Sequence, residues 1–162
     1  MSNSTYNKIF KNTNVFTDFF CQDNFVKKVL FPVPNYRLTE EQYIALKKTI
    51  DFLCLPQIIY EVVFEDGNRI IRHDLETETY TEYVKKSNSI LECQLYSDCT
   101  FWGIGISHED HAIIGCSAEF YQVFQSFYGK NDKDEFVAYW EANQKDFGSD
   151  IAWLVNLKDK LV

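Results

Sequence analysis

The stretch FWGIGISHEDHAIIGC, residues 101–116, predicts a β-hairpin and with it a sheet. Two apolar, β-branched runs flank a short polar segment, residues 108–111, as in strands joined by a tight turn. If the loop holds two residues, 109–110, or all four, Ile106 faces Ile113 and the two histidines lie opposite each other. The core-facing side chains of the hairpin are then Trp102, Ile104, Ile106 and Ile113.

Two interpretations of the histidines remain open. Adjacent imidazoles of His108 and His111 could bind a metal, with Asp110 or a remote carboxylate as third ligand, because a zinc site needs at least three. However, no third His or Cys lies nearby, and the spacing differs from the helical His-Glu-x-x-His motif of metalloproteases. A polar turn that closes an apolar hairpin explains the same residues. We therefore predict no metal and no other cofactor.

The remaining candidate motifs in this region also favour structural roles. Gly103 and Gly105 lack the third glycine and the helix of a phosphate-binding turn. They are expected to let an aromatic side chain or a helix pack closely on the strand. Cys116 is expected to be a buried, inert thiol. With no Gly-x-Ser-x-Gly elbow and no Cys-x-x-Cys pair in the chain, the sequence predicts no enzyme activity.

The hairpin extends into a larger sheet. The segment 57–75, QIIYEVVFEDGNRIIRHDL, places β-branched and aromatic residues on both sides of Asp66-Gly67, a dipeptide suited to a tight hairpin turn. Strands are therefore expected at about 57–65 and 68–74. SILECQLYS, residues 89–97, continues the strand pattern, so the sheet has about five strands joined mostly by short turns.

Two helices have clear boundary signals. Residues 40–54 repeat apolar side chains at helical spacing, Thr39 can cap the start, and Gln42 completes a capping box. A second helix is expected over 118–128, between Ser117 and Gly129. Less regular segments predict further short helices: one or two before Pro32, one around Phe136, Tyr139 and Trp140, and one opened by Ser149.

The order of helices, then strands, then helices, without βαβ alternation, predicts an α+β fold. We expect an antiparallel sheet of about five strands with the N- and C-terminal helices packed mainly on one face. The length of 162 residues suits a single globular domain spanning residues 1–162.

The composition restricts partner and compartment. A net charge of −8 disfavours nucleic-acid partners, whose phosphates require clustered cations, and favours a basic protein. The N-terminus has no apolar signal core, and no apolar run reaches the roughly eighteen residues of a membrane span. The five cysteines are odd in number and widely spaced, which suits free thiols in a reducing compartment. The prediction is a cytoplasmic protein without a membrane partner.

The acidic segment, residues 61–82, is the strongest candidate surface. Seven acids against two arginines give it a charge of −5. Acids interleaved with tyrosines suit a Lys- and Arg-rich partner through salt bridges and cation–π contacts. The alternative is a solvated strand edge whose charges deter aggregation. The predicted partner-binding residues are Asp74, Glu76, Glu78, Tyr80, Glu82 and Tyr83.

A short, acidic, aromatic-rich α+β chain without a catalytic motif resembles the immunity proteins that neutralise bacterial toxins, including those of contact-dependent growth inhibition. The resemblance covers the general character of the whole chain. It implies a non-enzymatic protein that binds and neutralises a cognate toxin, a basic domain such as a nuclease. Two alternatives stay open: a small metal-dependent hydrolase that uses His108 and His111, and a small-ligand domain with an aromatic-lined pocket between sheet and helices. The sequence leaves the oligomeric state open.

Overall fold

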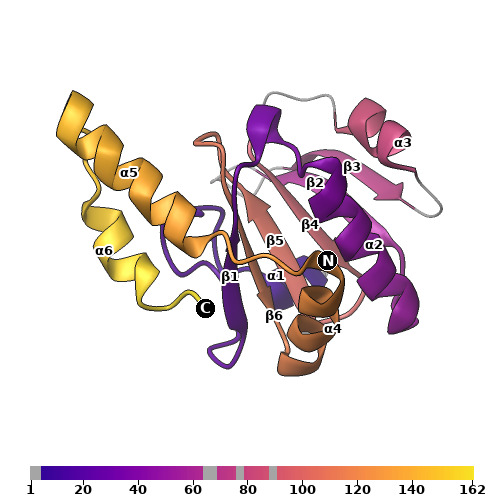
Figure 1. Cartoon of the computed structure of the whole chain (residues 1–162). Helices are drawn as coiled ribbons and strands as arrows, with labels where there is room; N and C mark the ends of the chain where they lie inside the picture. Colours follow the sequence, from indigo (N-terminus) through magenta and orange to yellow (C-terminus); the bar gives the residue numbers. More distant parts are fainter. Residues whose placement is uncertain (1–4, 64–68, 76–78, 88–90) are drawn as a thin grey trace.

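The protein is described by a computed structural model that covers residues 5–63, 69–75, 79–87 and 91–162. It contains a six-stranded antiparallel sheet in the order β1-β6-β5-β4-β2-β3, with helices before, between and after the strands (Figure 1). The predicted α+β class is confirmed. The strands are β1 Val26–Leu30, β2 Ile58–Val63, β3 Arg69–Leu75, β4 Cys93–Ser97, β5 Trp102–Ile106 and β6 Ala112–Cys116.

Six helices surround this sheet in the described residues: α1 Thr5–Ile9, α2 Glu40–Phe52, α3 Tyr80–Lys86, α4 Ala118–Tyr128, α5 Lys133–Phe147 and α6 Ala152–Lys158. The two helices with clear boundary signals begin as predicted. Thr39 and Gln42 form the reciprocal capping box of α2, and Ser117 caps α4, which ends at Gly129 with φ 69°. The cap of α6 is Ile151 rather than Ser149. No helix in the described part of the chain has the length and apolar content of a membrane span.

The β5–β6 hairpin is confirmed, but its predicted register is wrong by one residue. Ile106 pairs with Ala112, and Gly105 pairs with Ile113. The reason is the loop: the Ser107 amide donates to the His111 carbonyl, which leaves three residues between them, and Asp110 takes φ 54°. Ile113 therefore points to the opposite face from Trp102, Ile104 and Ile106.

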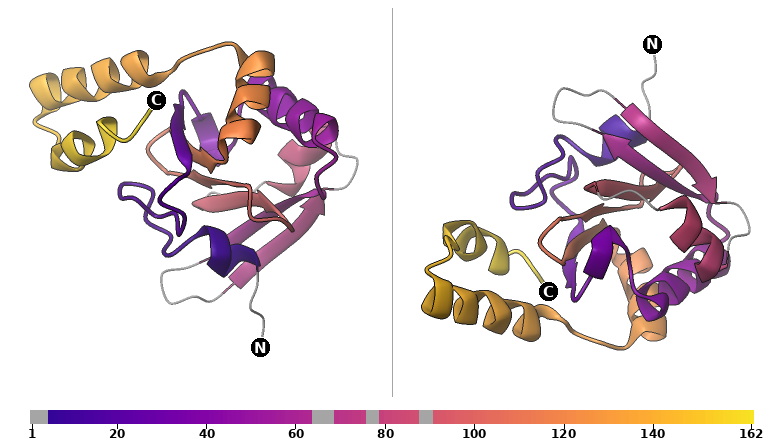
Figure 2. Two further views of the ribbon diagram at one scale, coloured as in Figure 1. Left: turned by 90° about the horizontal axis from the view of Figure 1, so that it is seen from below. Right: turned by 90° about the horizontal axis from the view of Figure 1, so that it is seen from above.

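Helices cover both faces of the sheet, which corrects the expectation that they pack mainly on one face. Helices α2, α3 and α4 lie over the face that carries Trp102 and Ile104, whereas α1 and the segment after it lie over the other (Figure 2). Helices α5 and α6 join this second core beyond β1. The physical reason is that β4, β5 and β6 are buried at every residue, so both faces need an apolar cover.

Gly103, Gly105 and Gly115 create a flat area on the second face of the sheet. A Cβ added to Gly103 would lie 2.6 Å from both Ile9 Cγ2 and Phe10 Cζ, and one added to Gly115 would lie 2.6 Å from Phe20 Cε2. The aromatic N-terminal segment thus packs directly against the backbone of β5 and β6, as expected for Gly103 and Gly105.

Candidate functional site

The two histidines at the hairpin tip have different surroundings. The His108 side chain is half exposed, with Nδ1 2.6 Å from Glu92 Oε1 and Nε2 3.2 Å from Glu109 Oε1. His111 is fully buried and stacks on Trp153 with the ring planes 8° apart. Burial lowers the pKa of His111 to about 4, so its ring is neutral at pH 7.

No three His, Cys, Asp or Glu side chains are grouped for metal binding in the described ranges, and so no such group includes the two histidines. The Nδ1 atom of His111 lies 3.2 Å from the Glu109 carbonyl oxygen, which can accept a hydrogen bond from it. A neutral ring bonded in this way, packed against Trp153, acts as part of an aromatic core.

The acidic segment is only partly described, because Glu76 and Glu78 lie outside the described residues. Asp74 is exposed near the end of β3. Tyr80 and Glu82 belong to α3, which Thr79 caps by accepting a hydrogen bond from the Glu82 amide. Glu82 pairs with Lys85 at 3.0 Å, so part of its charge is neutralised locally.

Tyr83 is a core residue, which removes it from the predicted contacts with a partner. Its side chain is fully buried and stacks on Tyr43 with ring centroids 4.3 Å apart. Its hydroxyl accepts a hydrogen bond from the Leu38 amide at 3.1 Å, and burial raises its pKa well above the ordinary value. Tyr80, half-buried, donates to the Leu38 carbonyl at 3.2 Å. These tyrosines fix α3 to the start of α2.

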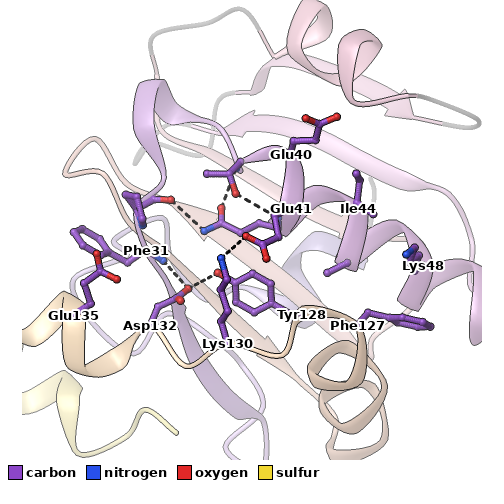
Figure 3. Close-up of a pocket in the computed structure, with 14 residues that line it drawn as sticks. Phe31, Glu40, Glu41, Ile44, Lys48, Phe127, Tyr128, Lys130, Asp132 and Glu135 are labelled. Carbon is purple, nitrogen blue, oxygen red and sulfur yellow. Dashed lines mark hydrogen bonds and ion pairs between the residues drawn. The ribbon is translucent and has the colours of Figure 1, made fainter.

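A pocket of about 700 Å³ opens on the same helical layer, between the start of α2, the end of α4 and the segment that leads into α5 (Figure 3). Its lining comes from chain segments that the sequence pattern did not connect. The lining residues are Phe31, Pro32, Thr39, Glu40, Glu41, Gln42, Ile44, Ala45, Lys48, Phe127, Tyr128, Lys130, Asp132 and Glu135.

Asp132 holds one wall of the pocket together. Its Oδ2 accepts from the Phe31 amide at 3.0 Å and from the Tyr128 hydroxyl at 2.6 Å (Figure 3). Buried Lys28 donates to the Lys130 carbonyl at 2.7 Å, and its Nζ lies 5.8 Å from the centre of the Tyr128 ring. Burial lowers the pKa of Lys28, whereas Asp132 opposes this shift. The network fixes the connection between α4 and α5 to β1.

The rim of the pocket is acidic. Three exposed acids, Glu40, Glu41 and Glu135, border it against two lysines, whereas the fourth acid of the lining, Asp132, is buried in the wall. Lys130 pairs with Glu41 across the opening (Figure 3), and Lys48 Nζ lies 5.9 Å from the centre of the Phe127 ring. Glu40 and Glu135 form no ion pair with any described residue. Their carboxylates are therefore accessible to a cationic group.

Exposed apolar side chains border the pocket and continue beyond it. Ile44 and Phe127, each 41% exposed, line the pocket, and Phe52, 68% exposed, lies outside its lining. The rings of Phe52 and Phe127 meet edge to face, 6.2 Å apart. We call the group of Glu40, Ile44, Phe52, Phe127 and Glu135 the α2–α4 surface.

Sequence reasoning missed the α2–α4 surface, although one signal was present. Ile44 and Phe52 are eight residues apart, which is close to two helical turns, and both lie off the buried stripe of α2 that contains Leu46 and Ile50. Apolar residues repeated on the polar side of an amphipathic helix indicate a second contact face. The meeting of this face with Phe127 required the tertiary structure.

Comparisons of the chain with protein-family models, with curated proteins and with solved structures give no match.

Proposed function

We propose that the protein is a non-enzymatic immunity protein that binds and neutralises a basic toxin domain, and that the α2–α4 surface takes part in the contact. The observation that carries this proposal is the association of exposed Ile44, Phe52 and Phe127 with Glu40 and Glu135, two acids without an ion pair in the described part of the chain. An apolar centre with a charged border is the usual composition of a protein–protein interface.

The charge of the border indicates the partner's chemistry. A net charge of −8 and an acidic rim attract a positively charged protein surface and repel an acidic one. A suitable partner presents apolar side chains surrounded by Lys or Arg. A nucleic-acid-cleaving toxin has such a surface because its substrate is a polyanion.

The described acids of the predicted segment belong to the same proposal. Helix α3 packs on α2 through the stack of Tyr83 on Tyr43, so Glu82 lies in the same helical layer as Glu40. Asp74, Tyr80 and Glu82 remain proposed contacts, together with Glu76 and Glu78, which lie outside the described residues. Tyr83 would contribute to binding only indirectly, by holding α3 and its contact residues in place.

The test is binding kinetics with the product of the gene directly upstream, measured over a salt series. Phe52→Ala is expected to speed dissociation, at a cost of about 2 kcal/mol or more if Phe52 fills a pocket on the partner. Glu40→Gln/Glu135→Gln is expected to slow association mainly at low salt, because exposed charges are screened over about 8 Å at physiological ionic strength.

The control variants are Val155→Ala and Glu141→Gln/Asp146→Asn, which change exposed residues on α6 and α5. They should bind like the wild type. Wild-type binding by both α2–α4 variants would move the contact elsewhere on the protein. Failure of the wild-type chain to bind the upstream product would count against the inhibitory function itself.

A further inference from the structure

A second pocket, of about 420 Å³, lies beside the hairpin tip and does not share any residue with the α2–α4 surface. Phe16, Trp140 and Trp153 supply its aromatic walls, and His108, Glu109, Ser149 and Asp150 complete the lining. The elements that meet here are the N-terminal segment, the β5–β6 loop, the middle of α5, the α5–α6 connection and the start of α6. This pocket belongs to the core on the opposite face of the sheet.

The aromatic walls stand nearly perpendicular to one another. The Trp140 and Trp153 rings lie 5.3 Å apart with an interplanar angle of 84°, and the Phe16 and Trp153 rings lie 4.9 Å apart at 72°. Perpendicular walls can approach a compact group from two directions. A flat guanidinium group, in contrast, gains most from one parallel ring.

The walls are held in place from behind. The Trp153 indole donates to the Asp150 carbonyl at 3.1 Å, and buried His111 stacks on the Trp153 ring. Trp140 is only 7% exposed and therefore has little freedom to move. Such preorganisation lowers the entropic cost of binding a ligand.

The polar part of the lining is acidic. Glu109 and Asp150 are partly or fully exposed carboxylates, and no lysine or arginine lines the pocket. Within the described residues, Asp150 forms no ion pair, and Glu109 faces only His108, at 3.2 Å. Aromatic faces together with carboxylates favour a cation over a neutral or anionic ligand.

We propose that this pocket binds a small organic cation with a trimethylammonium or similarly compact alkylammonium head group. The tryptophan and phenylalanine rings contact the methyl groups, and Glu109 and Asp150 neutralise the charge. A trimethylammonium group occurs both in free small molecules and in phospholipid head groups. The free molecule fits better, because the phosphate of a lipid head group lies close to its ammonium and would be repelled by the two carboxylates.

The test is calorimetric titration of the full-length protein with choline at constant ionic strength. The neutral isostere 3,3-dimethylbutan-1-ol and the anionic phosphocholine are each expected to bind at least about tenfold more weakly, which equals about 1.4 kcal/mol at 25 °C. Fluorescence offers a second readout, because Trp140 and Trp153 line the pocket whereas Trp102, the third tryptophan, is buried against Phe120.

Two variants locate the site. Glu109→Gln/Asp150→Asn keeps the shape of both side chains, including the acceptor at residue 150 that receives the Ala152 amide, and should weaken choline binding about tenfold. Trp153→Leu should weaken it at least as much. The controls Asp146→Asn and Phe147→Leu change exposed residues near the end of α5 and should bind choline like the wild type.

Several outcomes would overturn the proposal. They are the absence of choline binding, equal binding of choline and its neutral isostere, and wild-type binding by the Glu109→Gln/Asp150→Asn variant. Tighter binding of phosphocholine than of choline would instead assign the site to a lipid head group. Tighter binding of arginine amide than of choline would contradict the compact head group. None of these measurements involves a toxin partner, so their result is independent of the inhibitory function.

Discussion

Replacement of Gly105 by alanine tests the close packing of the N-terminal segment on the sheet. The added Cβ would lie 2.6 Å from Phe19 Cζ and 2.7 Å from Val15 Cγ1, whereas ordinary van der Waals contact begins at 3.4 Å. Both neighbours are buried, so neither can turn into solvent. Overpacking of this kind costs about 1–3 kcal/mol. The lower entropy of the unfolded chain with alanine returns about 0.4–1 kcal/mol.

The expected net loss is therefore about 1–2 kcal/mol in the free energy of unfolding, measured by urea denaturation followed by circular dichroism. For a chain of this size the melting temperature should fall by about 2–8 °C. Because the clash is with Phe19, Phe19→Leu should cost less in the Gly105→Ala background than in the wild type, with a coupling of about 0.5 kcal/mol or more.

Gly148→Ala is the matched control. Gly148 has φ 67° and no atom within 4 Å of an added Cβ, so its replacement strains the backbone without crowding a neighbour. Its cost should add to that of Phe19→Leu without coupling. A Gly105→Ala protein within about 0.5 kcal/mol of the wild type, or the absence of coupling with Phe19→Leu, would refute the packing argument.

Two further predictions concern buried polar groups. The pKa of His111 is about 4 in the folded protein and about 6.5 in the unfolded chain, so the unfolded state binds more protons between these values and stability falls as the pH drops from about 6.5 to 4. Urea denaturation at pH 7 and at pH 4 measures this loss in the free energy of unfolding, and His111→Phe should reduce the loss by about 3 kcal/mol. An unchanged pH dependence would show that His111 is not the group responsible. Tyr83→Phe removes the acceptor of the buried Leu38 amide and should lower the free energy of unfolding by about 1–3 kcal/mol. The control Tyr80→Phe should cost less, because the Tyr80 hydroxyl is half-buried and water can take its place. Equal losses would contradict the core role of Tyr83.

Local signals predicted those parts of the fold in which short-range chemistry decides the structure. The capping box of Thr39 and Gln42 and the Ser117 cap defined the starts of α2 and α4, because a helix end is determined by residues within one turn. The β5–β6 hairpin was visible from its composition. Its register was not, because it depends on the positive φ of Asp110, which composition alone does not reveal.

Two elements escaped prediction. Strand β1 lies in the segment before Pro32 where short helices were expected, and its Lys27 and Lys28 argue against a buried strand. Both are buried: Lys27 pairs with Asp18 at 2.8 Å, and Lys28 reaches the Lys130 carbonyl. No element was predicted for α3, and a strand edge was one of two interpretations of the acidic segment, although Thr79 and Glu82 have the spacing of a helix start.

The candidate site was less predictable than the fold. Tyr83 has the amphipathic character of an interface residue, and only its stack on Tyr43 shows that it belongs to the core. The pockets combine residues from distant parts of the chain, such as Phe16 with Trp153 and Phe31 with Phe127. Local patterns of spacing and composition do not show which distant residues the fold brings together.

The position of β1 also affects how the chain can fold while it is being synthesised. Leu30 pairs with Ala112, which follows it by 82 residues, so the ribosome needs about 4–16 s at 5–20 residues per second to deliver the partner strand. During this interval Phe19 and Phe20 lack the glycine-lined backbone of β5 and β6 against which they pack. The nascent chain therefore carries Phe19 and Phe20 without their cover until β5 and β6 have been made. We expect this aromatic segment to depend on chaperones during that interval.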